Sequence, residues 1–343
     1  MTDNISLALT VLVSTSISAL VVYKWVKSRL VERPKGDWKR IGTISNLYIY
    51  PMKSSRYKLL SEAETTEKGL REIRNDGFLS LRDRGFVAFR EDTNQFITGR
   101  TYHNLIGITI NSVSPDMVEF SCEGIEPLKI KVPTEFKNEE VKMWNDEEIP
   151  TVDCGDEASK WITKLLGVEK PLRIGYWPDS ILTRRNVKKF HKERTDLFNI
   201  ENEYSGTYSD LSSFLIINES SVVDINSKLP PGSTLVSHKN FRPNIHISGP
   251  EAFDEDKWKW LKIGENAVFR VFCPCTRCSF TTINPETKIK DKNLEPIKTL
   301  KTYRVATEEK QKKVVGTTPF MGVYASLYKA GNIAVGDSVY LSD

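Results

Sequence analysis

Short runs of apolar residues, spaced as in β-strands, dominate the first half of the chain beyond residue 40. Residues 41–50 form the first of these runs, which stops at Pro51. A turn at residues 92–94 separates two further runs and predicts a hairpin. The strands expected after the first are residues 85–91, 95–98, 105–113, 117–122 and 128–132. Many short strands with few helices are typical of a body rich in β-barrel structure.

Helical periods are few, and the clearest covers residues 156–166, with Gly167 as its stop signal. Its apolar face is expected to carry Ala158, Trp161, Ile162, Leu165 and Leu166. A helix over 219–229 is predicted to be capped by Asn218, and Pro296 suits the first turn of a helix that ends at Tyr303. Strands are expected over residues 214–217 and 268–272, and two more around a Gly-Asp turn within residues 330–341.

The N-terminal segment differs from the rest because residues 5–23 contain no charge. Nineteen residues are just enough for a helix to cross a bilayer. The segment does not begin with Lys or Arg, as a cleaved signal peptide would, and basic residues follow it instead. We therefore expect a transmembrane anchor over residues 1–23, a basic linker over 24–40 and a cytosolic body. A buried or disordered leader is the alternative.

Composition narrows the class of protein only slightly. The net charge of the 343 residues is +4, and much of the basic excess lies near the N-terminus, so composition does not favour a nucleic-acid-binding protein. The five cysteines are an odd number without regular spacing, which argues against a disulfide framework and for a reducing compartment.

Three of the five cysteines lie within six residues, in Cys273-Pro-Cys275-Thr-Arg-Cys278. No second cysteine pair and no suitably spaced histidine accompanies them, so four-ligand zinc and iron–sulfur sites are not supported. Arg277 precedes Cys278, and a neighbouring positive charge favours the thiolate, which is a soft metal ligand. Small buried hydrophobes are an equally good interpretation of these cysteines, taken alone.

Several ordered motifs elsewhere in the chain share the pattern of one family. The chain resembles MOSC-domain proteins and, more narrowly, the mitochondrial amidoxime-reducing components. The resemblance rests on Tyr50-Pro-Met-Lys-Ser-Ser55, Leu81-Arg-Asp-Arg84, Tyr208-Ser-Asp-Leu-Ser-Ser-Phe214, Asn240-Phe-Arg-Pro-Asn244, Ile263-Gly264, Cys275-Thr-Arg-Cys278, Thr281-Thr-Ile-Asn-Pro285, the 295–304 segment and Gly336-Asp-Ser-Val-Tyr340. These motifs cover essentially the whole chain.

The resemblance implies an α+β fold rich in β-barrel structure. Its MOSC N-terminal β-barrel part would cover residues 41–180 and its MOSC domain residues 181–343, after an N-terminal transmembrane helix. It also implies a molybdenum–molybdopterin cofactor, with Cys278 as both the metal ligand and the catalytic residue. The matching cofactor-binding positions are Lys53, Ser54, Arg84, Ser212, Arg242, Asn244, Thr276, Arg277 and Tyr324. Cationic side chains would offset the anionic groups of the cofactor, and Asn244 can both donate to and accept from a pterin ring.

Each of these residues also has a simpler interpretation. Lys53 and Arg84 could be solvated surface charges, Arg242 a partner of a nearby carboxylate, and Tyr324 a core aromatic residue. The joint occurrence of the motifs, in family order, favours the cofactor site.

By resemblance, the expected activity is the reduction of N-hydroxylated compounds such as amidoximes and hydroxylamines. The chain has no further redox motif, so electrons are expected from cytochrome b5 and its NADH-dependent reductase. The expected location is the outer mitochondrial membrane, with a single span and the catalytic part in the cytosol; a peroxisomal or endoplasmic-reticulum membrane is the alternative. The competing hypotheses are a membrane-anchored carrier of molybdenum cofactor or a sulfur-transfer protein without turnover, and an interaction platform with inert cysteines.

Overall fold

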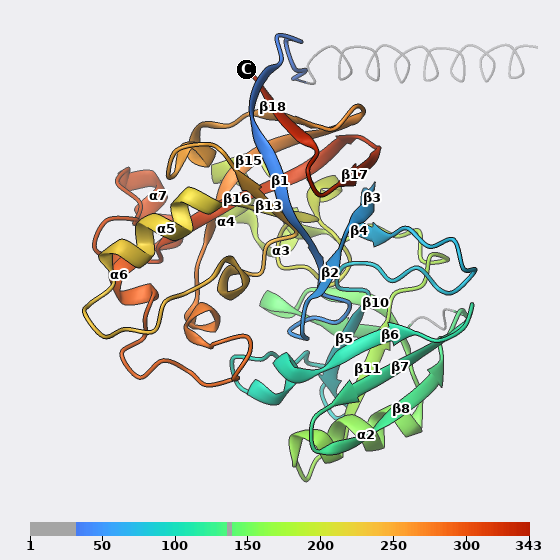
Figure 1. The fold of residues 1–343 in the computed structure, drawn as a ribbon. Helices are drawn as coiled ribbons and strands as arrows, with labels where there is room; N and C mark the ends of the chain where they lie inside the picture. Colours follow the sequence, from blue (N-terminus) through green and yellow to red (C-terminus); the bar gives the residue numbers. More distant parts are fainter. Residues whose placement is uncertain (1–31, 136–138) are drawn as a thin grey trace, which may run out of the picture. The chain divides into compact units, whose positions relative to one another are not determined.

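A closed seven-stranded barrel forms the centre of residues 38–342 in the computed structural model, which describes residues 32–135 and 139–343 (Figure 1). Its strands follow the order β13-β12-β16-β15-β14-β18-β1, and β1 pairs back onto β13. Neighbouring strands are antiparallel except β12 and β13. The barrel strands are β1 Lys39–Ile49, β12 Phe214–Asn218, β13 Ile245–Ser248, β14 Trp260–Ile263, β15 Ala267–Thr276, β16 Phe320–Lys329 and β18 Ser338–Ser342.

Three smaller sheets surround this barrel. The strand β2 (Lys58–Leu60) extends β1 at one edge. The four-stranded sheet contains β5 Phe86–Arg90, β11 Leu172–Tyr176, β10 Glu148–Asp153 and β9 Glu139–Lys142. The two three-stranded sheets contain β17 Asn332–Ala334, β3 Glu62–Thr66 and β4 Gly69–Glu72, and β6 Thr109–Ser112, β7 Met117–Cys122 and β8 Ile125–Lys131.

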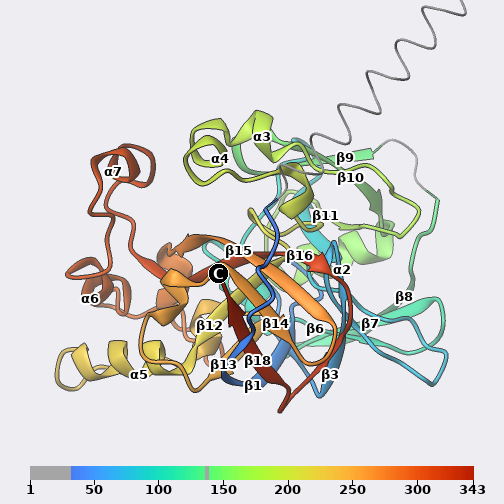
Figure 2. The same cartoon turned by 90° about the horizontal axis from the view of Figure 1, so that it is seen from above.

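The helices are short and lie outside the barrel. In both views α5, α6 and α7 lie together on one side of it, and the β6–β8 sheet lies on the other side (Figures 1 and 2). The α-helices are α2 Asp156–Leu166, α3 Val187–Phe190, α4 Lys192–Phe198, α5 Glu219–Lys228, α6 Ile297–Lys301 and α7 Glu309–Val315. The 3₁₀ helices are η1 His103–Gly107, η2 Trp144–Asp146, η3 Asn202–Tyr204, η4 His238–Phe241, η5 Asp254–Lys257 and η6 Ser279–Thr282.

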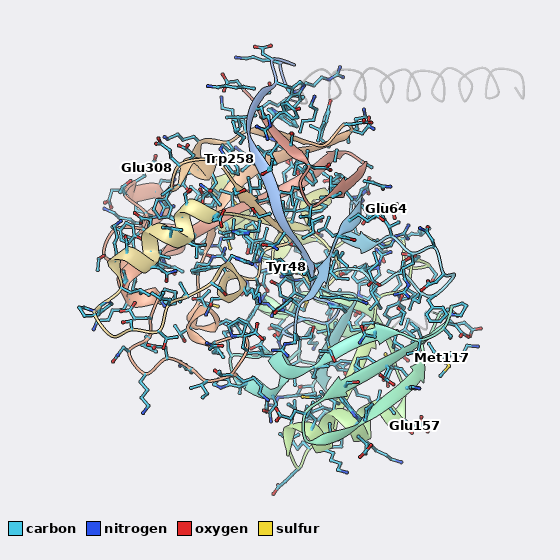
Figure 3. The ribbon with its side chains drawn as sticks, viewed as in Figure 1. Tyr48, Glu64, Met117, Glu157, Trp258 and Glu308 are labelled. Atoms are coloured by element: carbon cyan, nitrogen blue, oxygen red, sulfur yellow. The ribbon has the colours of Figure 1, made fainter. Side chains whose placement is uncertain are left out.

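Alternating burial along the strands builds the main core. On β15 the side chains of Phe269, Val271, Cys273 and Cys275 are buried, while those between them are only half-buried. Phe269 meets Phe214 of β12 edge to face, with ring centroids 5.0 Å apart. Tyr48 lies on β1 and is 2% exposed (Figure 3). The hydrophobic effect of this continuous apolar core is what holds the barrel closed.

Several sequence predictions are confirmed closely. The helix α2 has the predicted bounds, and Gly167 ends it in the left-handed conformation at φ 62°. The helix α5 begins where expected, and the Asn218 side chain accepts a hydrogen bond from the Ser220 amide. The strands β1, β7 and β12 lie within one to two residues of their predicted ends.

Three local predictions are only partly right. Residues 103–107 form the helix η1, so the strand expected over 105–113 is reduced to β6. The second arm of the expected hairpin, residues 95–98, makes isolated bridges rather than a strand. The two C-terminal strands exist, but β17 pairs with β3 whereas β18 pairs with β1 and β14.

The predicted fold class needs one correction, which concerns the N-terminal transmembrane helix. No helix within residues 32–135 or 139–343 is long and apolar enough to cross a membrane. The helix α2 has 11 residues, whereas a span needs about 20. The predicted anchor over residues 1–23 and the linker as far as residue 31 lie outside the described residues. For residues 32–135 and 139–343 the structure therefore supports the barrel-rich class, and the predicted transmembrane helix is not part of it.

Candidate cofactor-binding cavity

All ten residues selected from the sequence line one cavity of about 360 Å³. Three come from the segments that follow β1 or precede β5, and seven come from residues beyond 200. They are Lys53, Ser54, Arg84, Ser212, Arg242, Asn244, Thr276, Arg277, Cys278 and Tyr324. The fold therefore brings the distant motifs to one place, which is the arrangement a shared ligand requires.

Three of these ten residues have a left-handed backbone, which is unusual for residues other than glycine. The φ angles are 71° at Ser54, 49° at Arg84 and 56° at Arg242. Such conformations cost roughly 1–3 kcal/mol each and persist only where other contacts hold them. At Arg84 the amide donates to the Tyr50 carbonyl at 2.7 Å, and the Arg84 carbonyl accepts from the Thr207 hydroxyl at 2.6 Å. The three residues with strained backbones therefore all lie in the wall of the cavity.

Lys53 is a buried cation of the cavity wall, and it is paired with a carboxylate. It is 7% exposed, and its ammonium donates to the Tyr208 carbonyl at 2.9 Å and to Asp210 Oδ1 at 2.6 Å. Burial lowers the pKa of Lys53, although Asp210 opposes this shift. Burial alone would raise the pKa of Asp210, but the Lys53 charge and the hydrogen bonds from Lys53 and Trp144 together outweigh that effect and hold the pKa below its ordinary value. The two groups therefore form an ion pair at neutral pH.

Arg84 and Arg242 lie on the ring of the buried Tyr50. Their guanidinium carbons are 4.8 Å and 4.0 Å from its centroid, within the range of cation–π contact. Arg84 also forms an ion pair with Asp83, which outweighs the effect of burial and raises the pKa of Arg84. Burial, with a further contribution from Arg84, lowers the pKa of Arg242 to about 10.

Arg242 retains one donor that no neighbour uses. Its Nη1 donates to the Ser55 carbonyl at 2.8 Å, whereas its Nη2 is buried without a hydrogen-bond partner among the described residues. A buried donor left unpaired costs about 1–3 kcal/mol, more when it is charged. An anionic ligand in the cavity would remove that cost.

Arg277 behaves differently because the backbone already uses its guanidinium. Nε donates to the Met321 carbonyl at 2.7 Å and Nη1 to the Phe241 carbonyl at 2.9 Å. Two neighbouring polar residues are also engaged. The Asn244 side chain accepts from the Leu215 amide at 3.1 Å and donates to the Tyr48 carbonyl at 3.3 Å, and Ser212 donates to the Ala325 carbonyl at 2.7 Å. The side chains of Arg277, Asn244 and Ser212 therefore form part of the cavity wall, and few of their N–H and O–H groups are left to donate to a ligand.

The cysteines differ sharply in their surroundings. Cys278 is exposed, lines the cavity and immediately precedes η6, at the point where the chain leaves β15. Cys273 and Cys275 are buried within the strand, and burial raises the pKa of both thiols. Cys275 also lines the cavity but is only 2% exposed, so Cys278 is the cysteine of the cluster whose thiol is most accessible to a ligand.

Comparisons with known proteins support one family. The MOSC N-terminal β-barrel domain model matches residues 41–169, and the MOSC domain model matches residues 203–340. The chain is 34% identical over 324 residues to mitochondrial amidoxime reducing component 2 of Rattus norvegicus, covering 94% of this chain and 89% of that protein. It is 35% identical over 304 residues to mitochondrial amidoxime-reducing component 1 of Homo sapiens, covering 88% and 84%. The chain belongs to the MOSC-domain family.

A solved structure of the YUAD protein from Bacillus subtilis aligns with this MOSC-domain chain. The alignment covers 89% of this chain and 99% of the YUAD chain. The identity is 11% and the TM-score is 0.34, so nothing further is drawn from it.

MOSC domains bind the molybdenum cofactor, and the cavity of this MOSC-domain chain has a composition that fits an anionic ligand. Its lining contains six cationic side chains and a single carboxylate, that of Asp210. The cations are Lys53, Arg84, Arg100, Arg194, Arg242 and Arg277. The unpaired Nη2 of Arg242 is a hydrogen-bond donor suited to a phosphate group. The accessible thiol of Cys278 is of the type that, as a thiolate, suits a soft metal.

The lining of the MOSC-domain cavity also contains residues that were not selected from the sequence, and four of them affect its charge and contacts. Asp210 lies inside the quoted 208–214 motif, where only Ser212 was chosen, so that motif was sufficient to find it. Arg194 donates to the Thr276 hydroxyl, and Arg100 lies 4.3 Å above the Trp144 ring. Arg100, Trp144 and Arg194 come from surface segments without a motif, and only the tertiary fold brings them to the cavity.

Proposed function

We propose that this protein is a molybdenum-cofactor-dependent oxidoreductase that reduces N-hydroxylated compounds, as the names of its relatives indicate for amidoximes. The observation that carries the proposal is the convergence, in one cationic cavity, of an exposed cysteine and a buried guanidinium with one nitrogen that has no partner among the described residues. This cofactor needs a thiolate that can bind its metal and a hydrogen-bond donor that can bind its phosphate group.

In this proposal Cys278 is the protein ligand of the metal. Lys53, Arg84 and Arg242 offset the negative charge of the cofactor, because each presents a cationic group at the cavity wall. The remaining cofactor contacts come from Ser54, Ser212, Asn244, Thr276, Arg277 and Tyr324. Arg277 and Asn244 act mainly by fixing the wall, since the backbone already engages their side chains.

The proposed reaction converts an amidoxime into an amidine and water, and it consumes two electrons and two protons. The cofactor, when bound, supplies the two-electron redox centre for removal of the N–OH oxygen. The chain's own residues orient the substrate and hold the cofactor. By family resemblance, cytochrome b5 and its NADH-dependent reductase supply the electrons. The names of the relatives support a mitochondrial location.

The test uses the full chain, expressed in cells that synthesise the cofactor. We expect about one molybdenum per chain and benzamidoxime consumption with the reconstituted electron chain. Cys278→Ser should lose its metal and fall to background turnover while keeping its melting temperature, because the side chain is exposed and the change in volume is small. Cys122→Ser is the matched control, since Cys122 lies outside the cavity lining.

Other outcomes separate the competing functions. Release of intact cofactor to an acceptor, without benzamidoxime consumption, would identify a carrier. A metal-free preparation, or a Cys278→Ser variant with undiminished metal, would reject the cofactor site as proposed.

A further inference from the structure

The segment that follows Cys278, residues 279–286, forms part of the cavity wall. It contains η6, whose Phe280 and Thr281 line the cavity. The Thr281 amide and hydroxyl donate to the Cys278 carbonyl at 3.1 Å and 3.0 Å, which ties the segment to the proposed metal ligand. Further along, the Asn284 side chain accepts from the Glu286 amide at 2.8 Å. The segment therefore begins in the cavity wall and ends at Glu286, outside the cavity lining.

Phe280 makes the first contact of this segment with the part of the chain before residue 180. A Cβ atom at Gly99 would lie 2.5 Å from Cε2 of Phe280 and 3.1 Å from Cγ1 of Ile106, so a larger residue at position 99 would displace the ring. The same ring lies 5.2 Å from the guanidinium carbon of Arg242, whose Nη2 has no partner among the described residues. Phe280 therefore packs on Gly99 and lies beside the donor that a ligand would use.

Glu286 makes the second contact, through three polar partners. Its Oε1 accepts from the Tyr57 hydroxyl at 2.8 Å and from the Lys239 ammonium at 3.2 Å, and its Oε2 accepts from the Arg56 guanidinium. Lys239 also donates to the Tyr57 hydroxyl at 2.7 Å. The Arg56 amide donates to the Ile108 carbonyl at 2.9 Å, which fixes the loop that carries Arg56 and Tyr57. These four residues, called the Glu286 cluster below, therefore join the end of the segment to a fixed loop.

The Glu286 cluster is charged but only partly buried. Burial alone would raise the pKa of Glu286, but hydrogen bonds from Tyr57 and Lys239 and the charges of Arg56 and Lys239 outweigh it and hold the pKa below its ordinary value. The side chains of Arg56, Lys239 and Glu286 are 34%, 29% and 48% exposed. Ion pairs this exposed are screened by salt, and each contributes little to stability. Contacts of this kind can break and re-form without unfolding the rest of the wall.

The position of Arg242 requires that part of the wall moves when a ligand binds. Its Nη2 is shielded from solvent, so a ligand can reach that nitrogen only if a neighbouring side chain moves. Two rings lie beside the guanidinium, those of Tyr50 at 4.0 Å and Phe280 at 5.2 Å. Tyr50 is 1% exposed and is held in the interior, whereas Phe280 is only half-buried and belongs to the 279–286 segment. Phe280 is therefore the ring that can move aside.

We propose that residues 279–286 form a gate of the cavity, that Glu286 is its latch, and that opening of this latch sets how fast the molybdenum cofactor enters and leaves. This inference rests on the proposed function and adds the control of cofactor exchange to it. Phe280 closes the gate against Gly99, and the Glu286 cluster holds it closed. Glu286 is a positioning residue, because it lies outside the cavity lining and acts on the cofactor only through the gate.

The experiment follows the loss of molybdenum from the loaded full chain after dilution, as the metal that stays with the protein through gel filtration. Glu286→Gln keeps the shape of the side chain but removes its charge, so we expect the metal to leave about 5-fold faster than from the wild type, with unchanged initial turnover per bound molybdenum. Gly99→Ala should also accelerate the loss, because its Cβ displaces Phe280. Glu157→Gln, an exposed change on α2, is the matched control and should not alter the rate.

The ionic strength provides a second test of the latch. Added salt should accelerate the loss of molybdenum from the wild type, because it screens the partly exposed ion pairs of Glu286. The same salt should have much less effect on Glu286→Gln, in which those ion pairs are already absent. Equal salt dependence in the two proteins would show that Glu286 does not hold the gate.

Hydrogen exchange of the metal-free proteins gives a readout that needs neither cofactor nor turnover. The amides of residues 279–286 should exchange about 5-fold faster in Glu286→Gln than in the wild type, while those of α2 should not change. If the wild type holds molybdenum and reduces benzamidoxime but Glu286→Gln loses the metal at the wild-type rate, the inference is wrong while the proposed function stands. If the wild type holds no molybdenum, the proposed function itself fails. Tyr57→Phe, which removes one hydrogen bond to Glu286, decides the inference if Glu286→Gln does not fold.

Discussion

The barrel wall and the cavity wall are built by the same strands but follow opposite rules. In the barrel, apolar side chains alternate regularly, and residues such as Leu47 and Phe269 are fully buried among other apolar groups. In the cavity, three residues have left-handed backbones, charged groups gather, and one buried guanidinium nitrogen lacks a partner among the described residues. Stability lies in the first region, and the capacity to bind lies in the second.

The difference teaches how the fold positions chemistry. Lys53 follows β1, Asn244 precedes β13, and Cys278 follows β15, so these three functional groups lie beyond the ends of barrel strands. The barrel fixes these ends in space, and the residues just beyond them can keep strained or unpaired conformations. Substitutions in the barrel core should therefore lower the free energy of unfolding, whereas substitutions in the cavity wall should mainly lower the molybdenum content.

The largest effect on stability is expected from Phe269→Ala in the barrel. Phe269 is 0% exposed and contacts Phe214, so truncation removes buried area and leaves a cavity. Such changes cost about 3–5 kcal/mol, measured here as the free energy of unfolding in urea. Leu59→Ala on the edge strand β2 is the control, since Leu59 is 57% exposed. A loss below about 1 kcal/mol at Phe269 would contradict the division between the two regions.

A smaller effect should separate the two arginines of the cavity wall. Arg277→Lys leaves the Met321 and Phe241 carbonyls without their planar donor, so we expect the unfolding free energy of the metal-free protein to fall by about 1–3 kcal/mol. Arg242→Lys loses a single hydrogen bond, to the Ser55 carbonyl, and should change that stability less but lower the molybdenum content several-fold.

Urea unfolding of the metal-free proteins and elemental analysis of the loaded proteins measure the two effects. Equal stability loss in both variants, with equal metal content, would show that the two arginines have the same role.

The smallest effect concerns pH and the stacked pair of His238 and His246, whose ring centroids are 3.9 Å apart. Burial, together with Lys239, lowers the pKa of His238 to about 4, and burial, together with His238, lowers that of His246 to about 3. The unfolded chain therefore binds protons more readily, so the stability from these neutral rings is present above pH ~6.5 and is lost as the pH falls toward 4. We expect a loss of about 1 kcal/mol per histidine between pH 7 and 5.

Glu255 opposes this trend and provides the control for it. Burial raises the pKa of Glu255 to about 7, so its contribution is present below pH ~4.5 and is lost as the pH rises toward 7. The variant Glu255→Gln should therefore show the larger fall in unfolding free energy between pH 7 and pH 5. A Glu255→Gln protein that is as stable at pH 5 as at pH 7 would contradict the assignment of neutral buried histidines.

The sequence predicted local elements well where a single signal dominates. The apolar face and Gly167 fix α2, and Asn218 fixes the start of α5. It did not predict the closure of the barrel, because pairing between β1 and β13 depends on residues about 200 positions apart. The strand expected at residues 105–108 fails because its buried apolar residues, Leu105 and Ile106, pack equally well from a 3₁₀ turn.

The candidate cavity was predictable as a set of residues, but not in its internal bonding. The family motifs named ten lining residues, yet no motif indicates that all three guanidinium nitrogens of Arg277 donate to carbonyls, whereas Nη2 of Arg242 has no partner among the described residues. That difference arises from the path of the Met321 and Phe241 backbone, which only the assembled fold defines. The roles assigned to the ten residues stay predictions until the metal and turnover experiments are done.

The pairing of β1 with β18 has a consequence for biosynthesis. Lys39 faces Leu341, so the first strand of the barrel must wait on the ribosome until about 300 further residues have been made. At typical elongation rates that interval lasts roughly 15–60 s, during which the edge of β1 has no final partner on that side. The same adjacency places the beginning and end of the 38–342 body next to each other, so a circularly permuted gene that joins them with a short linker and opens a surface loop elsewhere should still encode a closed barrel.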